Sequence, residues 1–383
     1  MSANISEAVP ASCELLGLGE PTHGEPAFQW IRNALMPELI NRGFRSLVLE
    51  TDRAAALTLN DFVHHGRGTL DQAMEHGFSH GLGALVANRR CIAWLHDFNQ
   101  SRPEAERVTV HGFDAPTEFT SAPSPRRFLL PACNYLEADI DIDELVGDDE
   151  QWSDPRAVMD AHSSPGATSA AITLRAITHD LLVSLYARAP ELIASTSLRA
   201  WHTARIHLVT ALNLLAYHRQ AAQRIDEVAR VNGLLATRDA IMAQNLIDIR
   251  AEEAGRGATL VFAHNRHLQR RHSQWTLGGM NLNWSSAGAI IDSVIGGHYT
   301  FVAGSLGSSS CLGLQPPPQD TYEGLLGKAV SSWGLVSPTP IDGGRPRVDV
   351  TPDQGYFPLD DAVIQSADTI LHVSDAATVP SES

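Results

Sequence analysis

The sequence predicts an α/β protein with a three-layer α/β/α core, a mostly parallel sheet and an all-helical insertion that forms a second lobe over the cleft. Short apolar runs alternate with amphipathic stretches in the first third of the chain and again after residue 255, which predicts the core. The region between them shows only helical periodicity, which predicts the insertion. We therefore expect core residues 1–130, a helical lobe at 131–254 and core residues 255–383.

The composition indicates a globular protein and argues against some classes of binding partner. With 383 residues, 43% of them hydrophobic, the chain can bury a large core. A formal net charge of -16 argues against a nucleic-acid backbone or an anionic membrane as a partner and leaves a small-molecule substrate. The first residues lack the basic and apolar segments of a signal peptide, so we expect a cytoplasmic protein. The oligomeric state stays open.

The first third of the chain reads as β-α-β-α-β. An apolar strand at 13–18 precedes a helix that runs from 27 to about 42, and an apolar strand at 46–50 follows. Helices are predicted near 53–62 and 89–100, and another strand at 108–114. Strands separated by helices imply a parallel sheet with right-handed crossovers.

Later elements follow the same patterns. The insertion contains helical stretches at 167–188, 190–223 and 226–253. Strands are then predicted at 259–263, 299–303 and 369–373, with a short helix at 288–295. No structure is predicted for the proline-rich segment 313–350.

Three of the predicted strands end in ionisable residues. Glu20 and His23 follow the first strand, Glu50 ends the second, and His264 and His267 follow the strand at 259–263. Because the carboxyl ends of parallel strands meet at one edge of a sheet, these side chains are expected to form a site there. Thr22 and Glu25 fit a capping box, which would place His23 at the mouth of the next helix.

These residue types suit ester or lactone hydrolysis. His23 can remove a proton from water, and Glu20 can orient its imidazole. Arg32 lies about two helical turns further on, and its long side chain leans back toward an oxyanion near His23. Glu50 and His267 can hold the water or donate to the leaving group. No serine stands in a G-x-S-x-G elbow, which argues against an acyl-enzyme.

A metal site is the alternative for the same residues. Two carboxylates and two imidazoles are also ligands that a divalent metal accepts. The residue types alone leave both readings open.

Five motifs occur in this order: GEPTH with an arginine nine residues after the histidine, LVLETD, VHGFDAP, RDAIMAQN and FAHNRHLQR. Their order and number resemble the landmarks of the erythromycin-esterase-like hydrolases, which are also described as succinoglycan-biosynthesis-like proteins. The resemblance spans roughly residues 15–303 and implies that His23 is the general base, Glu20 and Glu50 the active-site carboxylates, His267 the second histidine and Arg32 the arginine. It also implies that no cofactor is needed, since the macrolide-hydrolysing members are regarded as metal-independent.

The same motifs contain Asp114, Arg238 and His264, which we assign to substrate binding. The predicted function is hydrolysis of an ester or lactone of a hydrophobic natural product by His-activated water, with macrolides among the candidate substrates and antibiotic resistance or biosynthesis as the context. The alternative is a biosynthetic tailoring enzyme of the same fold that catalyses acyl transfer, cyclisation or elimination. A metal-dependent hydrolase is less favoured, and a non-catalytic binding protein is disfavoured because all five motif residues are present.

Overall fold

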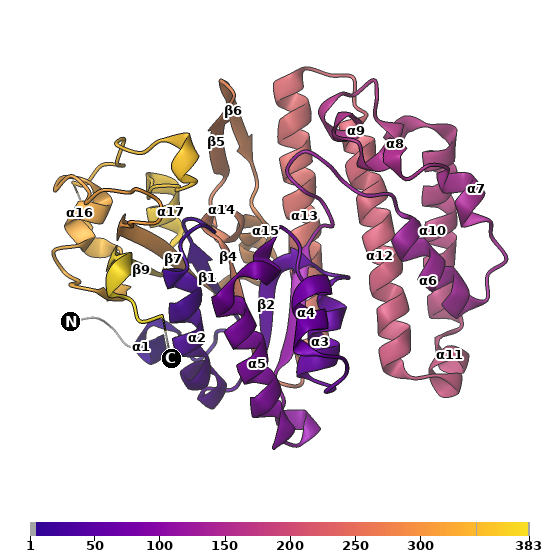
Figure 1. The fold of residues 1–383 in the computed structure, drawn as a ribbon, viewed down its shortest axis with the longest axis horizontal. Helices are drawn as coiled ribbons and strands as arrows, with labels where there is room; N and C mark the ends of the chain where they lie inside the picture. Colours follow the sequence, from indigo (N-terminus) through magenta and orange to yellow (C-terminus); the bar gives the residue numbers. More distant parts are fainter. Residues whose placement is uncertain (1–4, 342, 382–383) are drawn as a thin grey trace.

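The computed structural model describes residues 5–341 and 343–381. Within them, seven strands form one sheet in the order β3-β2-β4-β1-β7-β9-β8, parallel except for β8, which runs antiparallel to β9 (Figure 1). The strands are β1 (Leu15–Glu20), β2 (Phe44–Asp52), β3 (Thr109–Asp114), β4 (Ala258–His264), β7 (Tyr299–Ser308), β8 (Trp333–Val336) and β9 (Thr369–Asp375). The predicted fold class is confirmed.

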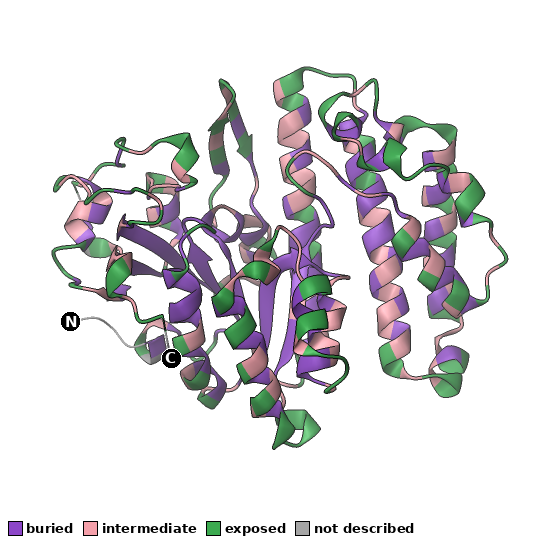
Figure 2. Cartoon of the chain, in the orientation of Figure 1, coloured by how far each residue is buried: buried purple, intermediate pink, exposed green. Residues whose placement is uncertain are grey.

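Helices cover both faces of the sheet, because successive side chains of each strand point to opposite sides. Leu16 and Leu18 of β1 pack into one core with α2, whereas Leu15 packs into a second core with Leu246 of α13. The strands are accordingly buried between the two layers (Figure 2). One layer comprises α1 (Ile5–Ala8), α2 (Ala27–Asn41), α3 (Ala56–Val63), α4 (Leu70–His76) and α5 (Val86–Gln100). The other comprises α13 (Glu227–Glu253), α15 (Ala287–Ile295), α16 (Tyr322–Leu326) and α17 (Asp361–Ser366).

A helical lobe stands beside the sheet and has a core of its own. Its helices are α6 (Arg126–Leu136), α7 (Ile142–Val146), α8 (Glu150–Ser153), α9 (Pro155–Met159), α10 (Ser169–Ala187), α11 (Ala189–Ser195) and α12 (Leu198–Ala221). Helix α13 joins the two parts, since its Leu234 belongs to the core of the lobe and its Ile249 to the core beneath the sheet. No strand occurs between residues 115 and 257, all of which the structure describes. None of the described helices has both the length and the apolar content needed to cross a bilayer.

Two local predictions are wrong. The stretch expected to form one helix at 190–223 is divided, because Ser197 accepts a hydrogen bond from the backbone of Ala200 and so begins α12 as a new helix. The capping box of Thr22 and Glu25 does not form, since α2 begins only after Pro26. His23 therefore lies on an open turn between β1 and α2. In this turn Thr22 Oγ1 accepts a hydrogen bond from the backbone N–H of Gly24.

A two-stranded hairpin was not predicted. It consists of β5 (Ser273–Leu277) and β6 (Met280–Trp284), separate from the main sheet, and it projects beside the amino-terminal half of α13 (Figure 1). Its turn is Gly278-Gly279, with φ of 56° and 82°. Two glycines at positive φ between alternating apolar residues are the signal from which the hairpin could have been predicted. Strand β8 was missed as well, because it lies in the proline-rich segment.

Candidate active site

The carboxyl ends of β1, β4 and β2, three neighbouring strands, bring the predicted residues to one edge of the sheet. Glu20 ends β1 directly opposite His264, which ends β4. Glu50 lies near the end of β2, on the other side of β4. The parallel arrangement therefore places side chains that are far apart in sequence next to one another.

Glu20 and His23 form an imidazole–carboxylate pair. His23 Nδ1 lies 2.7 Å from Glu20 Oε1, and the second carboxylate oxygen accepts a hydrogen bond of 2.7 Å from Gln29 Nε2 of α2. Glu20 is 3% exposed, whereas the His23 side chain is 41% exposed. The buried carboxylate thus fixes Nδ1 of the ring and leaves Nε2 for chemistry.

Glu50 stands between His23 and His267. Its Oε1 lies 3.4 Å from Nε2 of His23 and 3.4 Å from Nε2 of His267. Its Oε2 accepts a hydrogen bond of 2.7 Å from the backbone of His264. One carboxylate oxygen is therefore held by the backbone, and the other faces both imidazoles.

His267 sits in the short helix α14 (Asn265–Leu268), which Asn265 anchors to β7. The Asn265 side chain donates to the carbonyl of Gly304 and accepts from the amide of the same residue, at 2.8 and 2.9 Å. A Cβ atom on Gly19 would lie 2.1 Å from Asn265 Oδ1, so β1 can pass beneath this anchor only with glycine at that position.

Asp239 fixes the orientation of His267, and sequence reasoning missed it. His267 Nδ1 lies 3.0 and 3.1 Å from the two carboxylate oxygens of Asp239, which is fully buried. The same carboxylate accepts hydrogen bonds of 2.8 Å from Trp284 Nε1 and from the backbone of Ala287. Asp239 adjoins Arg238 in the RDAIMAQN motif, so a signal for it was present in the sequence.

Arg238 and Asp114 support the site from the side of β3. Arg238 Nε donates to Asp114 at 2.9 Å, and its Nη2 lies 2.5 Å from the other oxygen and 3.6 Å from Glu50 Oε1. His80 Nε2 is 3.0 Å from Asp114, and the other ring nitrogen of His80 contacts Glu118. The backbone of His80 has a φ of 55°. Asp114 is 1% exposed and fully engaged, so direct contact with a substrate does not fit its placement. Nothing in the sequence pointed to His80.

Arg32 does not reach the open part of the site. Its guanidinium donates to Asn33 at 2.8 and 3.1 Å and lies over the ring of Phe262, 4.8 Å from the ring centre. A small cavity of about 20 Å³ separates it from the Glu20–His23 pair. Packing beneath the site therefore sets the direction of the Arg32 side chain. In this position Arg32 does not make the predicted contact with an oxyanion.

His264 presents a polar atom without a protein partner. Its Nδ1 accepts a hydrogen bond of 3.1 Å from the backbone of Arg266, so the neutral ring carries its proton on Nε2. That Nε2 atom is buried and has no hydrogen-bond partner among the described residues, and the side chain lines the cavity in front of His23.

The charges of the site shift the protonation equilibria in opposite directions. Packing around His23 opposes its charge, but Glu50 and Glu20 outweigh this effect and raise the pKa of His23 well above its usual range. Burial would raise the pKa of Glu50, yet His23 and His267 hold it well below its usual range. Burial raises the pKa of Glu20, against its hydrogen bond with His23. Burial and the charge on His23 lower the pKa of His264 well below its usual range.

These groups open into a cavity of about 290 Å³. Its polar wall holds His23, Glu50, Arg238, His264 and His267, and its apolar wall holds Phe119, Leu235, Trp275 and Phe357. An apolar pocket with a few convergent polar groups and shifted pKa values is the usual form of an enzyme site.

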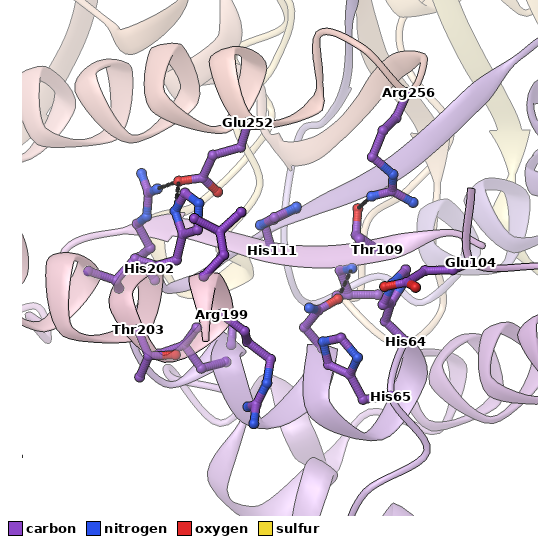
Figure 3. Close-up of a pocket in the computed structure, with 18 of the residues that line it drawn as sticks. His64, His65, Glu104, Thr109, His111, Arg199, His202, Thr203, Glu252 and Arg256 are labelled. Carbon is purple, nitrogen blue, oxygen red and sulfur yellow. Dashed lines mark hydrogen bonds and ion pairs between the residues drawn. The ribbon is translucent and has the colours of Figure 1, made fainter. Parts of the chain in front are cut away.

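A larger cavity of about 720 Å³ lies elsewhere, at the outer edge of β3 between α3 and α12 (Figure 3). Burial lowers the pKa of its His64 to about 4 and also lowers the pKa of His202. Its Glu252 is already paired with Arg53 at 3.2 Å and with Arg205 at 2.6 Å. Because burial lowers the pKa values of His64 and His202 and the Glu252 carboxylate is engaged, we place the candidate active site at the smaller cavity.

The metal alternative raised by the residue types depends on which donor atoms of the site remain free. Among the described residues, no group of three or more His, Cys, Asp or Glu side chains has an arrangement that could hold a metal ion. In the candidate site the Nδ1 atoms of His23, His264 and His267 are already engaged by hydrogen bonds.

Comparison with known proteins gives one family and one fold. Residues 40–372 match the model of a family described as erythromycin esterase. Among solved structures, a histidine-to-asparagine variant of the erythromycin esterase EreC in its open conformation aligns with a TM-score of 0.67 at 16% identity, covering 95% of this chain and 91% of that one. A Bacillus cereus protein gives 0.65 and a succinoglycan biosynthesis protein 0.63, each at 16% identity over 97% of this chain and 90% of theirs. No curated protein sequence matches the chain.

Proposed function

Since this chain belongs to the erythromycin esterase family, as its motifs predicted, we propose that it hydrolyses an ester or lactone of a hydrophobic small molecule with a water activated by His23. Membership supports a hydrolase that acts on ester bonds. Macrolides remain among the substrates to be screened. The observation that carries the mechanism is the 2.7 Å contact between Glu20 and His23, because it leaves Nε2 as the basic nitrogen facing the cavity.

The reaction needs one proton to move twice. As water attacks the ester carbonyl, its proton passes to His23 Nε2, while Glu20 stabilises the imidazolium that forms. When the tetrahedral intermediate collapses, the carbon–oxygen bond to the alcohol breaks and the same proton passes to the leaving oxygen. Glu50 Oε1, 3.4 Å from His23 Nε2, is positioned to hold the attacking water.

Two imidazoles are suited to stabilise the oxyanion. The Nε2–H of His264 is buried, preorganised and without a protein partner. Burial opposes a charge on His267, but Asp239 and Glu50 outweigh it and raise its pKa, which makes His267 a cationic donor. These side chains take the role that the sequence assigned to Arg32.

We further propose that the reaction uses no metal and no other cofactor. Arg238 lies 3.6 Å from Glu50, and the raised pKa of His267 adds positive charge beside the same carboxylate. A dication would have to compete with these charges, which supply the electrostatic stabilisation that a Lewis acid would otherwise bring. The net charge of -16 supports a small molecule as the partner and disfavours nucleic acid and anionic membranes.

Isotope labelling tests the proposal. Esters and lactones, macrolides included, are incubated with the protein in H₂¹⁸O, and the products are analysed by mass spectrometry. Hydrolysis incorporates one ¹⁸O atom into the carboxylic acid. Turnover with an unlabelled product would indicate acyl transfer, cyclisation or elimination and would overturn the hydrolytic mechanism.

A further inference from the structure

The cavity in front of His23 continues into a second one of about 100 Å³. Both cavities are lined by Glu118, Phe119, Leu235, Arg238 and Trp275. The second cavity extends between the β5–β6 hairpin and the amino-terminal half of α13, the two elements that stand side by side above the sheet in Figure 1. A path therefore leads from the catalytic edge of the sheet to the space under the hairpin.

The hairpin presents an apolar face to this space. Leu277, Met280 and Leu282 line the cavity, whereas Thr276 and Asn281, on the opposite face, are exposed. This alternation is typical of a two-stranded ribbon with one solvent-exposed face and one buried face. The hairpin is held beside α13 by a hydrogen bond of 2.7 Å from the backbone of Asn283 to Asn232 Oδ1.

The facing wall is also apolar. It is formed by Val231 and Leu234 of α13 together with Val158 and Met159 at the end of α9. Arg230 lines the cavity as well, but its guanidinium already donates at 2.7 Å to the carbonyls of Val158 and Met159. The space therefore suits a hydrocarbon group, since a polar one would lose its bonds to water there.

A series of rings joins this space to the base. His23 and His264 have ring centres 5.4 Å apart, and Phe357 lies 4.9 Å from His264. Trp275 lies 5.9 Å from Phe357, and Phe119 lies 5.7 Å from Trp275 at the junction of the two cavities. Phe119 is nevertheless 63% exposed, and Met159 is 50% exposed, so apolar surface remains uncovered along the path.

We propose that the cavity between the hairpin and α13 binds an apolar arm of the ester substrate while the ester carbonyl lies at His23. This inference rests on the proposed hydrolase function and specifies the shape of its substrate. A volume of about 100 Å³ is well below the roughly 300–1,000 Å³ that holds a whole drug-sized ligand, so the cavity takes one arm of the molecule. Continuity with the candidate active site identifies the occupant as part of the substrate.

Two ester series test the proposal. One is p-nitrophenyl acetate, butyrate and octanoate, which extends the acyl side, and the other is ethyl, butyl and octyl acetate, which extends the alcohol side. The cavity takes one arm of the ester, so only the series that extends this arm should gain. In that series kcat/KM is expected to rise by about threefold to fourfold for each methylene that enters the cavity. Leu277→Trp fills the cavity from the hairpin and should reduce kcat/KM for the longest ester of that series by roughly tenfold or more, the value of a few lost methylenes. Acetate esters with short chains should be unaffected.

The matched control is Gln274→Trp, which adds the same ring on the exposed face of the same strand. It should behave as the wild type in both series. Met280→Trp, on the paired strand opposite Leu277, repeats the test if the thermal melt shows that Leu277→Trp does not fold.

The outcomes separate this inference from the function on which it rests. Hydrolysis of p-nitrophenyl acetate with no gain from chain length in either series would overturn the chain-binding cavity and leave the hydrolase intact. Absence of hydrolysis for every ester would count against the proposed function instead. Calorimetric titration with n-decanol then tests chain binding independently of hydrolysis. Binding that is lost in Leu277→Trp and retained in Gln274→Trp supports the proposed chain-binding cavity. Absence of binding to the wild type overturns it.

Discussion

The imidazole of His23 lies 2.7 Å from the carboxylate of Glu20, on a single turn at the end of β1. The buried Glu20 fixes one ring nitrogen, and the partly exposed His23 offers the other to the cavity. This pair accounts for the proposed activation of water, and the predictions below test it and the residues that support it.

Replacing His23 by asparagine should abolish most of the activity without unfolding the protein. Loss of a general base typically lowers the rate by a factor of about 10²–10⁴, and the partly exposed ring contributes little to the core. Turnover of a p-nitrophenyl ester and the melting temperature are measured on the same preparation. His272→Asn, at an exposed position outside the cavity, is the control. A His23→Asn enzyme with the wild-type rate would show that another group is the base.

Activity should rise with pH through the raised pKa of His23. The base must be unprotonated, and Glu50 and Glu20 raise its pKa well above its usual range, so the ascending limb of kcat/KM lies on the alkaline side of an ordinary histidine. Glu20→Gln removes one of these charges and should move the limb to lower pH while it lowers the maximal rate. The profile is recorded for both proteins from about pH 5 to 10, a range that includes the usual histidine pKa. An unchanged limb in Glu20→Gln would contradict the assigned coupling.

Asp239→Asn should impair both stability and catalysis. The amide keeps the shape of the side chain, but it removes the charge that faces His267 and weakens buried hydrogen bonds from Trp284 and the backbone of Ala287. Hydrogen bonds to charged groups contribute about 1.5–3 kcal/mol each, so urea unfolding should report a loss of roughly 2–3 kcal/mol. Asp180→Asn, whose side chain is 85% exposed, is the control. A fully stable Asp239→Asn protein with normal turnover would refute the positioning role.

Stability should fall in mild acid, in part through His372. This side chain is fully buried beside Ser305, and burial lowers its pKa to about 4. Because the folded-state pKa lies below the unfolded value of about 6.5, the unfolded chain takes up a proton first, and stability that is complete above about pH 6.5 is lost as the pH falls toward 4. Between about pH 6.5 and 5 the contribution is of the order of 2 kcal/mol.

His372→Gln should remove that part of the pH dependence. Free energies of unfolding are compared at about pH 7 and pH 5 for the variant, the wild type and the control His298→Gln, since His298 is exposed and lacks the burial that lowers the pKa of His372. An identical pH dependence in His372→Gln and wild type would show that His372 does not contribute.

Removal of metal ions should leave the activity unchanged. The positive charges of Arg238 and His267 already face Glu50, so no Lewis acid is needed to stabilise the oxyanion. The protein is dialysed against a strong chelator and assayed before and after addition of zinc or manganese. Activity that is lost on dialysis and restored by either metal would make His23 a ligand and overturn the proposed role as a base.

The sequence by itself determined every strand of the seven-stranded sheet except β8, and most of the candidate active site. Glu20, His23, Glu50, His264 and His267 could be placed together because each follows an apolar strand, and the carboxyl ends of parallel strands share one edge whatever the order of the strands. Family membership followed from the motifs around the same strand ends.

Only the tertiary structure decided what surrounds that edge. Asp239 meets His267 and Arg238 meets Asp114 across 28 and 124 residues of chain, because α13 crosses the carboxyl edge of the sheet at one particular register. Local periodicity places residues on a face of a helix but does not fix which residue of another element they meet. Arg32 illustrates the limit: helical geometry allowed its side chain to reach toward His23, yet packing against Asn33 and Phe262 turned it beneath the site.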